Sequence, residues 1–318
     1  MIDISHKKSS LRTATAQGGI IAAASVVERV KNGSVPKGDV LATARAAGIQ
    51  AAKRTSDWIT FCHPMPLDYV DLRFELGETD IRIEATVRAV WKTGVEMEAM
   101  TAVQAAALNM YDMLKPLDEN LTIGASRLVA KRGGKSDFAD RFHTPPRAAV
   151  LVISDSTYAG TRQDKAGRAV SEFLGTQGVE VAVYDVLPDD VDQIAAKLRA
   201  LADDHSMDFI FTAGGTGFGA RDVTPEAIQQ AVDKSAPGIA EQMRSYGFDR
   251  TPFAMLSRQV CGLRGRTLIV SLPGSTAGAS ESVQALFPGL LHAIPMMHDL
   301  GHASGASHND KQENHGEK

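Results

Sequence analysis

The residues with the clearest chemical potential lie in the stretch TAGGTGFGARDVTPEA at positions 212–227, directly after a short apolar strand. Its glycines let the backbone turn sharply and bring N–H groups close to an anion; they are Gly214, Gly215 and Gly217. Asp222 would repel an anion, so we expect it to hold a divalent cation that neutralises phosphate charge. The stretch therefore predicts a site for a phosphate ester beside a carboxylate, with a plain strand-to-helix turn as the alternative.

A second group of candidates belongs to the first half of the chain, where positions 96–115 have the pattern of a long helix. Asp112 and Lys115 share one face of this helix, so they form either a surface salt bridge or a poised proton-transfer pair. His63 is either a phosphate contact or proton carrier, or a hydrogen-bonded histidine in a turn. We exclude a nucleophilic pair of His63 with Cys62, because adjacent residues of an extended chain point to opposite faces.

Composition and charge limit the classes of protein to consider. With 318 residues, 43% of them hydrophobic and 23% charged, the chain has the profile of a globular protein with two domains. Neither half has the basic excess of a nucleic-acid-binding protein, and no apolar run is long enough to cross a bilayer. The N-terminus lacks the apolar segment of a secretory signal, and the distant Cys62 and Cys261 offer no disulfide framework. We therefore expect a cytoplasmic protein without nucleic-acid or membrane partners.

The boundaries of the two expected domains follow from local composition. Residues 137–146 lack apolar periodicity and end in two prolines, so we expect them to link a domain at 1–136 to a domain at 147–300. Residues 301–318 are polar and poor in apolar side chains, which predicts a disordered tail.

The order of predicted strands and helices differs between the two halves of the chain. In the first half, helix-prone runs flank an antiparallel hairpin of alternating apolar residues at 70–76 and 81–87, which indicates an α+β fold. The second half alternates strand and helix, which predicts an α/β, doubly wound, mainly parallel sheet. Ligands bind at the carboxyl ends of the strands of such sheets. Four polar groups follow predicted strands and should converge there: Ser154 with Asp155, Asp189, the glycine stretch at 214–222, and Ser275 in LPGST.

Three segments of the first half carry a family pattern: KGDVLATARAAGIQAAKRT at 37–55, FCHPMPL at 61–67 and KTGVEMEAMTAVQAAALNMYDMLK at 92–115. They resemble the MoaC family of cyclic pyranopterin monophosphate synthases of molybdenum-cofactor biosynthesis. The resemblance covers about residues 1–136 and implies a ferredoxin-like α+β fold, assembly into dimers and hexamers, and active sites lined by neighbouring subunits. It implies conversion of 3',8-cyclo-7,8-dihydroguanosine triphosphate to cyclic pyranopterin monophosphate and pyrophosphate, with no cofactor required.

This resemblance assigns roles to individual residues. The catalytic ones are Lys37, Asp112 and Lys115, where the lysines balance triphosphate charge or shuttle protons and the aspartate is the acid or base. The matching substrate-contacting residues are Phe61, Cys62, His63, Glu96, Met97 and Glu98. The chain departs from many family members at 18–25, where they have a basic residue, and at Trp91, where they have glycine. These departures bear on local phosphate contacts and on one wall of the site.

Six elements of the second half occur in order between about residues 147 and 298: ISDS, QDK, LPD, GGTGxxxRDxTPEA, SRQ and LPGST. They resemble the MogA/MoaB family of molybdopterin adenylyltransferases. The resemblance implies Mg²⁺-dependent transfer of adenylate from ATP to the terminal phosphate of molybdopterin, with release of pyrophosphate. Asp222 would help place Mg²⁺, and Asp189 would position the metal or the substrate. The expected substrate contacts are Ser154, Asp155, Gly214, Gly215, Thr216, Gly217 and Ser275.

Two hypotheses for the whole chain follow. In the first, it is a bifunctional enzyme that serves an early and a late step of molybdenum-cofactor biosynthesis. In the second, an active synthase carries a non-catalytic molybdopterin-binding or assembly domain. Retention of Asp189 and Asp222 favours catalysis. The expected partners are pterin and nucleotide substrates, further copies of the chain through both domains, and other enzymes of the pathway.

Overall fold

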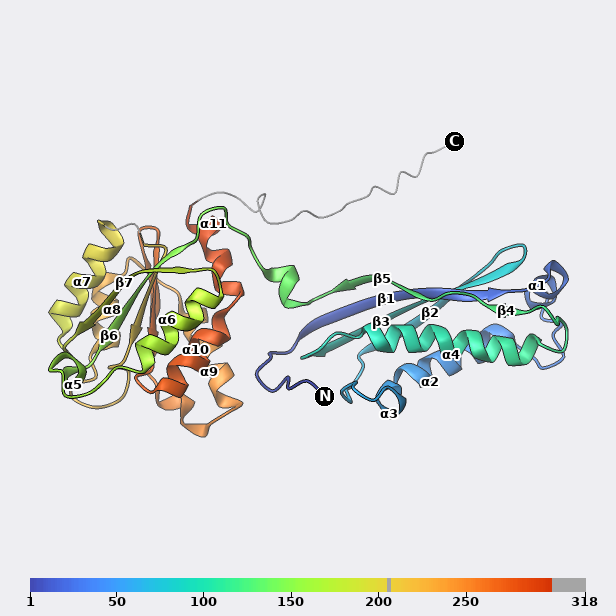
Figure 1. The fold of residues 1–318 in the computed structure, drawn as a ribbon, viewed down its shortest axis with the longest axis horizontal. Helices are drawn as coiled ribbons and strands as arrows, with labels where there is room; N and C mark the ends of the chain where they lie inside the picture. Colours follow the sequence, from blue (N-terminus) through green and yellow to red (C-terminus); the bar gives the residue numbers. More distant parts are fainter. Residues whose placement is uncertain (205–206, 299–318) are drawn as a thin grey trace. The chain divides into compact units, whose positions relative to one another are not determined.

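The computed structural model describes residues 1–204 and 207–298, which form two compact units. The first unit is Met1–Phe138, and the second comprises the described residues from Ala139 on (Figure 1). The disordered tail that the sequence predicts at 301–318 lies outside the described residues. Within the described part of the chain, no helix combines the length and the apolar character needed to cross a membrane.

The first unit is one antiparallel sheet with helices. Its strands pair in the order β2-β3-β1-β4, and β5 also pairs with β1. In chain order the elements are β1 (Ser10–Ile21), α1 (Ala24–Lys31), α2 (Val40–Ala52), α3 (Thr55–Trp58), β2 (Tyr69–Leu76), β3 (Asp80–Trp91), α4 (Glu96–Leu114), β4 (Thr122–Ile123), β5 (Arg127–Arg132) and the 3-10 helix η1 (Lys135–Phe138).

Apolar periodicity explains how this unit packs. Alternate residues of β3 are buried, among them Ile83 and Val87, and they belong to one core with the buried face of α4. On α4 the buried residues recur at helical spacing, as Val103 and Met110 show, and α2 packs along the same helix. The predicted hairpin is confirmed, because β2 and β3 pair in antiparallel register. The sheet with its helices forms the expected α+β domain.

The second unit is built around a mixed sheet in the order β7-β6-β8-β11-β10-β9. In chain order its elements are β6 (Arg147–Ile153), α5 (Asp155–Tyr158), α6 (Ala166–Thr176), β7 (Glu180–Leu187), α7 (Val191–Asp203), β8 (Phe209–Ala213), α8 (Thr224–Ala231), β9 (Lys234–Ser235), α9 (Pro237–Phe248), η2 (Pro252–Leu256), β10 (Cys261–Arg264), β11 (Thr267–Leu272), α10 (Thr276–Leu286), η3 (Gly289–His292) and α11 (Ala293–Met297). The strands β7, β6, β8 and β11 are parallel, whereas β10 and β9 add an antiparallel edge. This edge was not predicted, because two- and four-residue strands are too short to show alternation.

Helices cover both faces of this sheet (Figure 1). Phe209 and Phe211 of β8 pack with α6, α9 and α10, whereas Ile210 between them packs with α7 and α8. Successive residues of a strand point to opposite faces, so one continuous apolar run serves both cores. The covered faces leave the carboxyl ends of β6, β8 and β11 as the place where polar loops gather.

Candidate functional site

A cavity of about 580 Å³ opens at the carboxyl ends of β6, β8 and β11 in the second unit. Loops that follow these strands and β7 line it. Six of the residues expected at the site lie in this lining: Ser154, Asp189, Gly214, Gly215, Asp222 and Ser275. The fold thus brings together side chains that are up to 121 positions apart in the sequence.

Two glycines allow the loops to approach this closely. Gly214 has a φ of +118°, and a Cβ there would lie 2.2 Å from the carbonyl oxygen of Ile153. Gly215 has a φ of +63°, and its Cβ would lie 2.3 Å from Oγ1 of Thr224, which donates a hydrogen bond to the Gly214 carbonyl. Any side chain at these positions would therefore push the end of β8 away from its neighbours.

The residues expected to cradle a phosphate lie in different surroundings. The Gly214 N–H donates to the carbonyl of Leu272 at 3.1 Å, so it is already bonded within the sheet. Thr216 and Gly217 lie outside the cavity lining. Thr216 is buried, and its hydroxyl lies 3.1 Å from that of Ser257. Gly214 and Gly215 shape the cavity, whereas Thr216 and Gly217 shape the loop behind it.

Asp155 and Asp189 form a reciprocal pair between the loops after β6 and β7. The Asp155 N–H donates to Oδ2 of Asp189 at 2.9 Å, and the Asp189 N–H donates to Oδ1 of Asp155 at 3.0 Å. The Arg221 guanidinium also binds the Asp155 carboxylate with two nitrogens, at 2.9 and 3.0 Å. Asp155 is therefore engaged by protein groups and positions Asp189, and the substrate contact expected of it stays a prediction.

The electrostatics of the carboxylates differ. Burial raises the pKa of Asp189, and the charges of Asp155 and Asp222 add to this effect. The bond from the Asp189 N–H, followed by the contact with Arg221, lowers the pKa of Asp155. Asp222 accepts a bond from the Gly219 N–H at 2.7 Å. Two carboxylates that repel each other thus line one cavity.

These carboxylates fit the coordination habits of Mg²⁺. This ion is held by one or two carboxylates together with substrate phosphates, rather than by a cage of protein ligands. The oxygen donors of Asp189 and Asp222 meet that requirement, and a cation would relieve their repulsion. Over residues 1–204 and 207–298, no cluster of three or more ligand-type side chains offers a self-sufficient metal cage.

Two basic side chains that were not predicted as site residues also line the cavity. Arg162 and Lys165 line it, on either side of Asp164 in the RQDK segment. Asp164 accepts bonds from two N–H groups at the start of α6, at 3.0 Å each, and also from the hydroxyl of Tyr184. The QDK element of the sequence could have indicated this part of the site, but it did not show that its side chains line the cavity.

Ser154 and Ser275 are both helix caps. Ser154 Oγ accepts from the Thr157 N–H at 3.3 Å and starts α5, and Ser275 Oγ accepts from the Gly278 N–H at 3.2 Å and starts α10. Their positions in the lining follow from this capping role, because a helix that begins after a strand starts at the carboxyl edge of the sheet.

In the first unit, Lys37, Asp112 and Lys115 form a close cluster. Lys37 Nζ lies 2.8 Å from Oδ2 of Asp112 and 2.7 Å from its carbonyl oxygen, and Lys115 Nζ lies 2.8 Å from Oδ1. Hydrogen bonds from Lys115 and then Lys37 lower the pKa of Asp112 to about 2. The pKa of Lys115 is raised by the same contact. All three side chains are exposed, so the cluster presents two ammonium groups to solvent.

The remaining candidates of this unit gather at the start of α4. Glu98 is 4% exposed, and burial raises its pKa; the charge of Glu98 in turn contributes to a raised pKa of Cys62, which burial dominates. Nε2 of His63 is hydrogen-bonded to the carbonyl of Ile2 at 2.9 Å. Lys131 Nζ lies 3.4 Å from Oε1 of Glu96, which brings an unassigned lysine to this group. Phe61 and Met97 are exposed.

These two clusters do not meet within one chain. Glu98 and Asp112 lie fourteen residues apart on α4, which at about 1.5 Å per residue separates them by about 21 Å. The structure therefore separates the candidates of the first unit into two groups, one at each end of α4.

Comparison with known proteins matches each unit to a protein family. Residues 1–134 match the model of the MoaC family, and residues 149–292 match the family described as "Probable molybdopterin binding domain". A molybdenum cofactor biosynthesis bifunctional protein of Chlorobaculum tepidum is 42% identical over 95% of this chain and 96% of its own length. The chain belongs to this family of molybdenum cofactor biosynthesis bifunctional proteins.

Other relatives agree with this membership. The bifunctional protein of Synechococcus elongatus is 37% identical over 96% of this chain and 99% of its own length. A cyclic pyranopterin monophosphate synthase of Roseiflexus sp. is 52% identical over 44% of this chain and 90% of its own length. Both resemblances in the sequence are thus confirmed: this family member combines a MoaC domain with a MogA/MoaB-like domain.

Proposed function

We propose that the second unit transfers adenylate from ATP to molybdopterin and that the first forms cyclic pyranopterin monophosphate from 3',8-cyclo-7,8-dihydroguanosine triphosphate. One observation carries the proposal for the second unit. Asp189 and Asp222 meet in one cavity, which Gly214, Gly215 and two basic side chains also line. This arrangement suits a reaction between two phosphate-bearing substrates. A phosphate oxygen of molybdopterin would attack the α-phosphorus of ATP, and the bond to pyrophosphate would break.

The residues of the second unit have distinct parts in this reaction. Arg162 and Lys165 offset the negative charge of the substrate phosphates, which keeps both anions in one cavity. Asp155 holds the backbone that carries Asp189 and is itself held by Arg221. Asp189 and Asp222 would hold Mg²⁺, which supplies charge neutralisation at the transferred phosphate when it is bound.

The first unit supports a synthase through its lysine–aspartate cluster. With a pKa of about 2, Asp112 is ionised at neutral pH and keeps both ammonium groups of Lys37 and Lys115 in place. These ammonium groups can bind the triphosphate and donate protons during the rearrangement. The buried Glu98, whose pKa is raised, suits a proton acceptor or donor at the other end of α4.

We further propose that a complete synthase site uses two copies of the chain. The separation of about 21 Å along α4 supports this, since the Asp112 end of one copy would face the Glu98 end of another. The β-α-β-β-α-β element order and the strand order β2-β3-β1-β4 support the ferredoxin-like description of the unit.

The transfer proposal is tested with the full chain. Purified protein is incubated anaerobically with molybdopterin and Mg-ATP, and the products are separated by chromatography for wild type and Asp222→Asn. We expect adenylylated molybdopterin and pyrophosphate from wild type only. Tight molybdopterin binding without product would overturn the transfer proposal and favour a binding or assembly domain beside the synthase.

A further inference from the structure

The loop that carries Asp222 is held by a segment far along the chain. The loop connects β8 to α8, and the segment is the stretch between η2 and β10 that contains the SRQ element. The Arg258 N–H donates to the Thr216 carbonyl at 2.8 Å, and the hydroxyl of Ser257 lies 3.1 Å from that of Thr216. The two segments therefore run against each other immediately behind the cavity.

One guanidinium group joins the two ends of this loop. Nε of Arg258 donates to the Gly217 carbonyl at 2.7 Å, and a terminal nitrogen donates to the Asp222 carbonyl. The other terminal nitrogen forms an ion pair with Glu226 in the first turn of α8. Carbonyls five residues apart are thus fixed to a single planar group, which also fixes them to the helix.

The conformation held in this way determines where the Asp222 carboxylate lies. Its Oδ2 accepts the Gly219 N–H at 2.7 Å, and the Asp222 N–H donates back to the Gly219 carbonyl at 3.0 Å. A Cβ on Gly217 or Gly219 would come within 2.9 and 2.8 Å of this oxygen. The carboxylate therefore packs against the backbone of Gly217 and Gly219. Its position depends on the conformation of this loop.

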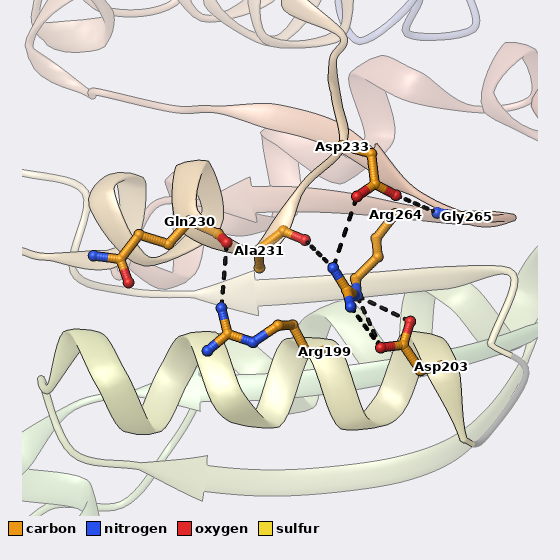
Figure 2. Close-up of polar contacts among 7 residues, drawn as sticks. All are labelled: Arg199, Asp203, Gln230, Ala231, Asp233, Arg264 and Gly265. Atoms are coloured by element: carbon orange, nitrogen blue, oxygen red, sulfur yellow. Dashed lines mark hydrogen bonds and ion pairs between the residues drawn. The ribbon is translucent and has the colours of Figure 1, made fainter.

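The opposite end of α8 is held by a separate set of contacts (Figure 2). Arg264 donates to the Ala231 carbonyl at 3.2 Å and binds the Asp203 carboxylate at 2.6 Å, and Arg199 donates to the Gln230 carbonyl at 3.2 Å. These bonds satisfy carbonyls that the helix end leaves without an internal partner. They lie a helix length, about 12 Å, from the Asp222 end.

We propose that Arg258 is a positioning residue for adenylyl transfer: it closes the loop at 217–222 so that Asp222 presents its carboxylate to the cavity. This inference rests on the function proposed for the second unit. Lysine cannot replace it, because a single ammonium nitrogen does not reproduce the fixed fork that reaches two carbonyls and a carboxylate at once.

The test compares Arg258→Lys with the matched change Arg264→Lys at the other end of α8, both in the full chain. Hydrogen exchange of the loop amides, that of Gly219 above all, is measured together with kcat and KM for ATP and with thermal unfolding. Arg258→Lys should speed loop exchange and lower kcat about 10- to 100-fold, with little change in the melting temperature. Arg264→Lys should lower the melting temperature while the exchange of the Asp222 loop and kcat remain those of wild type.

Glu226→Gln provides a second variant, because it removes the ion pair and leaves both carbonyl bonds. It should retain slow loop exchange and most of the transfer activity. The proposal would be overturned if Arg258→Lys kept the loop hydrogen exchange and the transfer activity of wild type. It would also be overturned if this variant lost its thermal unfolding transition, because Arg258 would then be a general structural residue. If wild type itself forms no product, the proposed function fails, while the exchange of the Gly219 amide still decides whether Arg258 holds the loop.

Discussion

The two units place their charged candidate residues in different ways. In the second unit, residues after four parallel strands meet in one cavity of one chain. In the first, the candidates are divided between the two ends of α4, because antiparallel strands end alternately at opposite edges and a long helix connects those edges. Strand direction therefore decides whether the candidate residues of a unit meet at one edge of the sheet or lie at two.

The largest expected effect tests whether the two units act independently. Lys115→Ala removes an ammonium group of the synthase cluster and should lower cyclic pyranopterin monophosphate formation about 10²- to 10⁴-fold while adenylyl transfer stays intact. Asp222→Asn should have the reverse effect. Both activities are measured on each purified variant, and circular dichroism verifies that each is folded. Loss of both activities in a folded variant would show that the sites are coupled.

Complementation between copies tests the contrast directly. Asp112→Asn and Glu98→Gln chains, each inactive as a synthase, are co-expressed with different tags and purified as mixed assemblies. If two copies share each site, a mixed pair keeps both residues intact in one of its two sites, so about half of wild-type activity should return.

The second unit supplies the control for this experiment. Asp189 and Asp222 line one cavity of the same chain. Mixed assemblies of Asp189→Asn and Asp222→Asn chains should therefore regain no transfer activity. A mixture of the first pair that stays inactive, although mixed assemblies form, would show that each chain completes its own synthase site.

The smallest expected effect concerns stability. The pKa of Asp189 is raised above 3.8, so the stability associated with its neutral form is present below that value and is lost as pH rises through the folded-state pKa. Asp189→Asn imitates the neutral form and should raise the melting temperature by a few degrees at pH 7, with the gain disappearing below about pH 4.

Asp155→Asn is the matched control, since the pKa of Asp155 is lowered. Its ionised form stabilises the fold above the unfolded-state pKa, and this contribution is lost as pH falls through the folded-state pKa. This variant should therefore melt below wild type at pH 7. Thermal melts across pH 3 to 8 provide both measurements, and a lower melting temperature for Asp189→Asn at pH 7 would contradict the electrostatic account.

The fold was predictable where patterns were long. The alternation from Ile81 to Val87 and the strand–helix succession after Ala148 indicated the two architectures, because each pattern reports which side of an element is buried. The antiparallel edge of the second sheet was missed, since β9 and β10 are too short to show a period. Among the candidates, the Asp112–Lys115 pair followed from helical spacing alone.

By itself the sequence determined the two families, the two fold classes and the residue types available for chemistry, because motifs and periodicity depend on near neighbours in the chain. Only the tertiary structure decided which of these residues meet. It showed that Asp155 bonds to Asp189, that Arg258 bonds to both ends of the Asp222 loop, and that Glu98 and Asp112 lie at opposite ends of one helix. These relations depend on strand order, strand direction and helix length, which place distant segments in space and leave no mark on the local pattern.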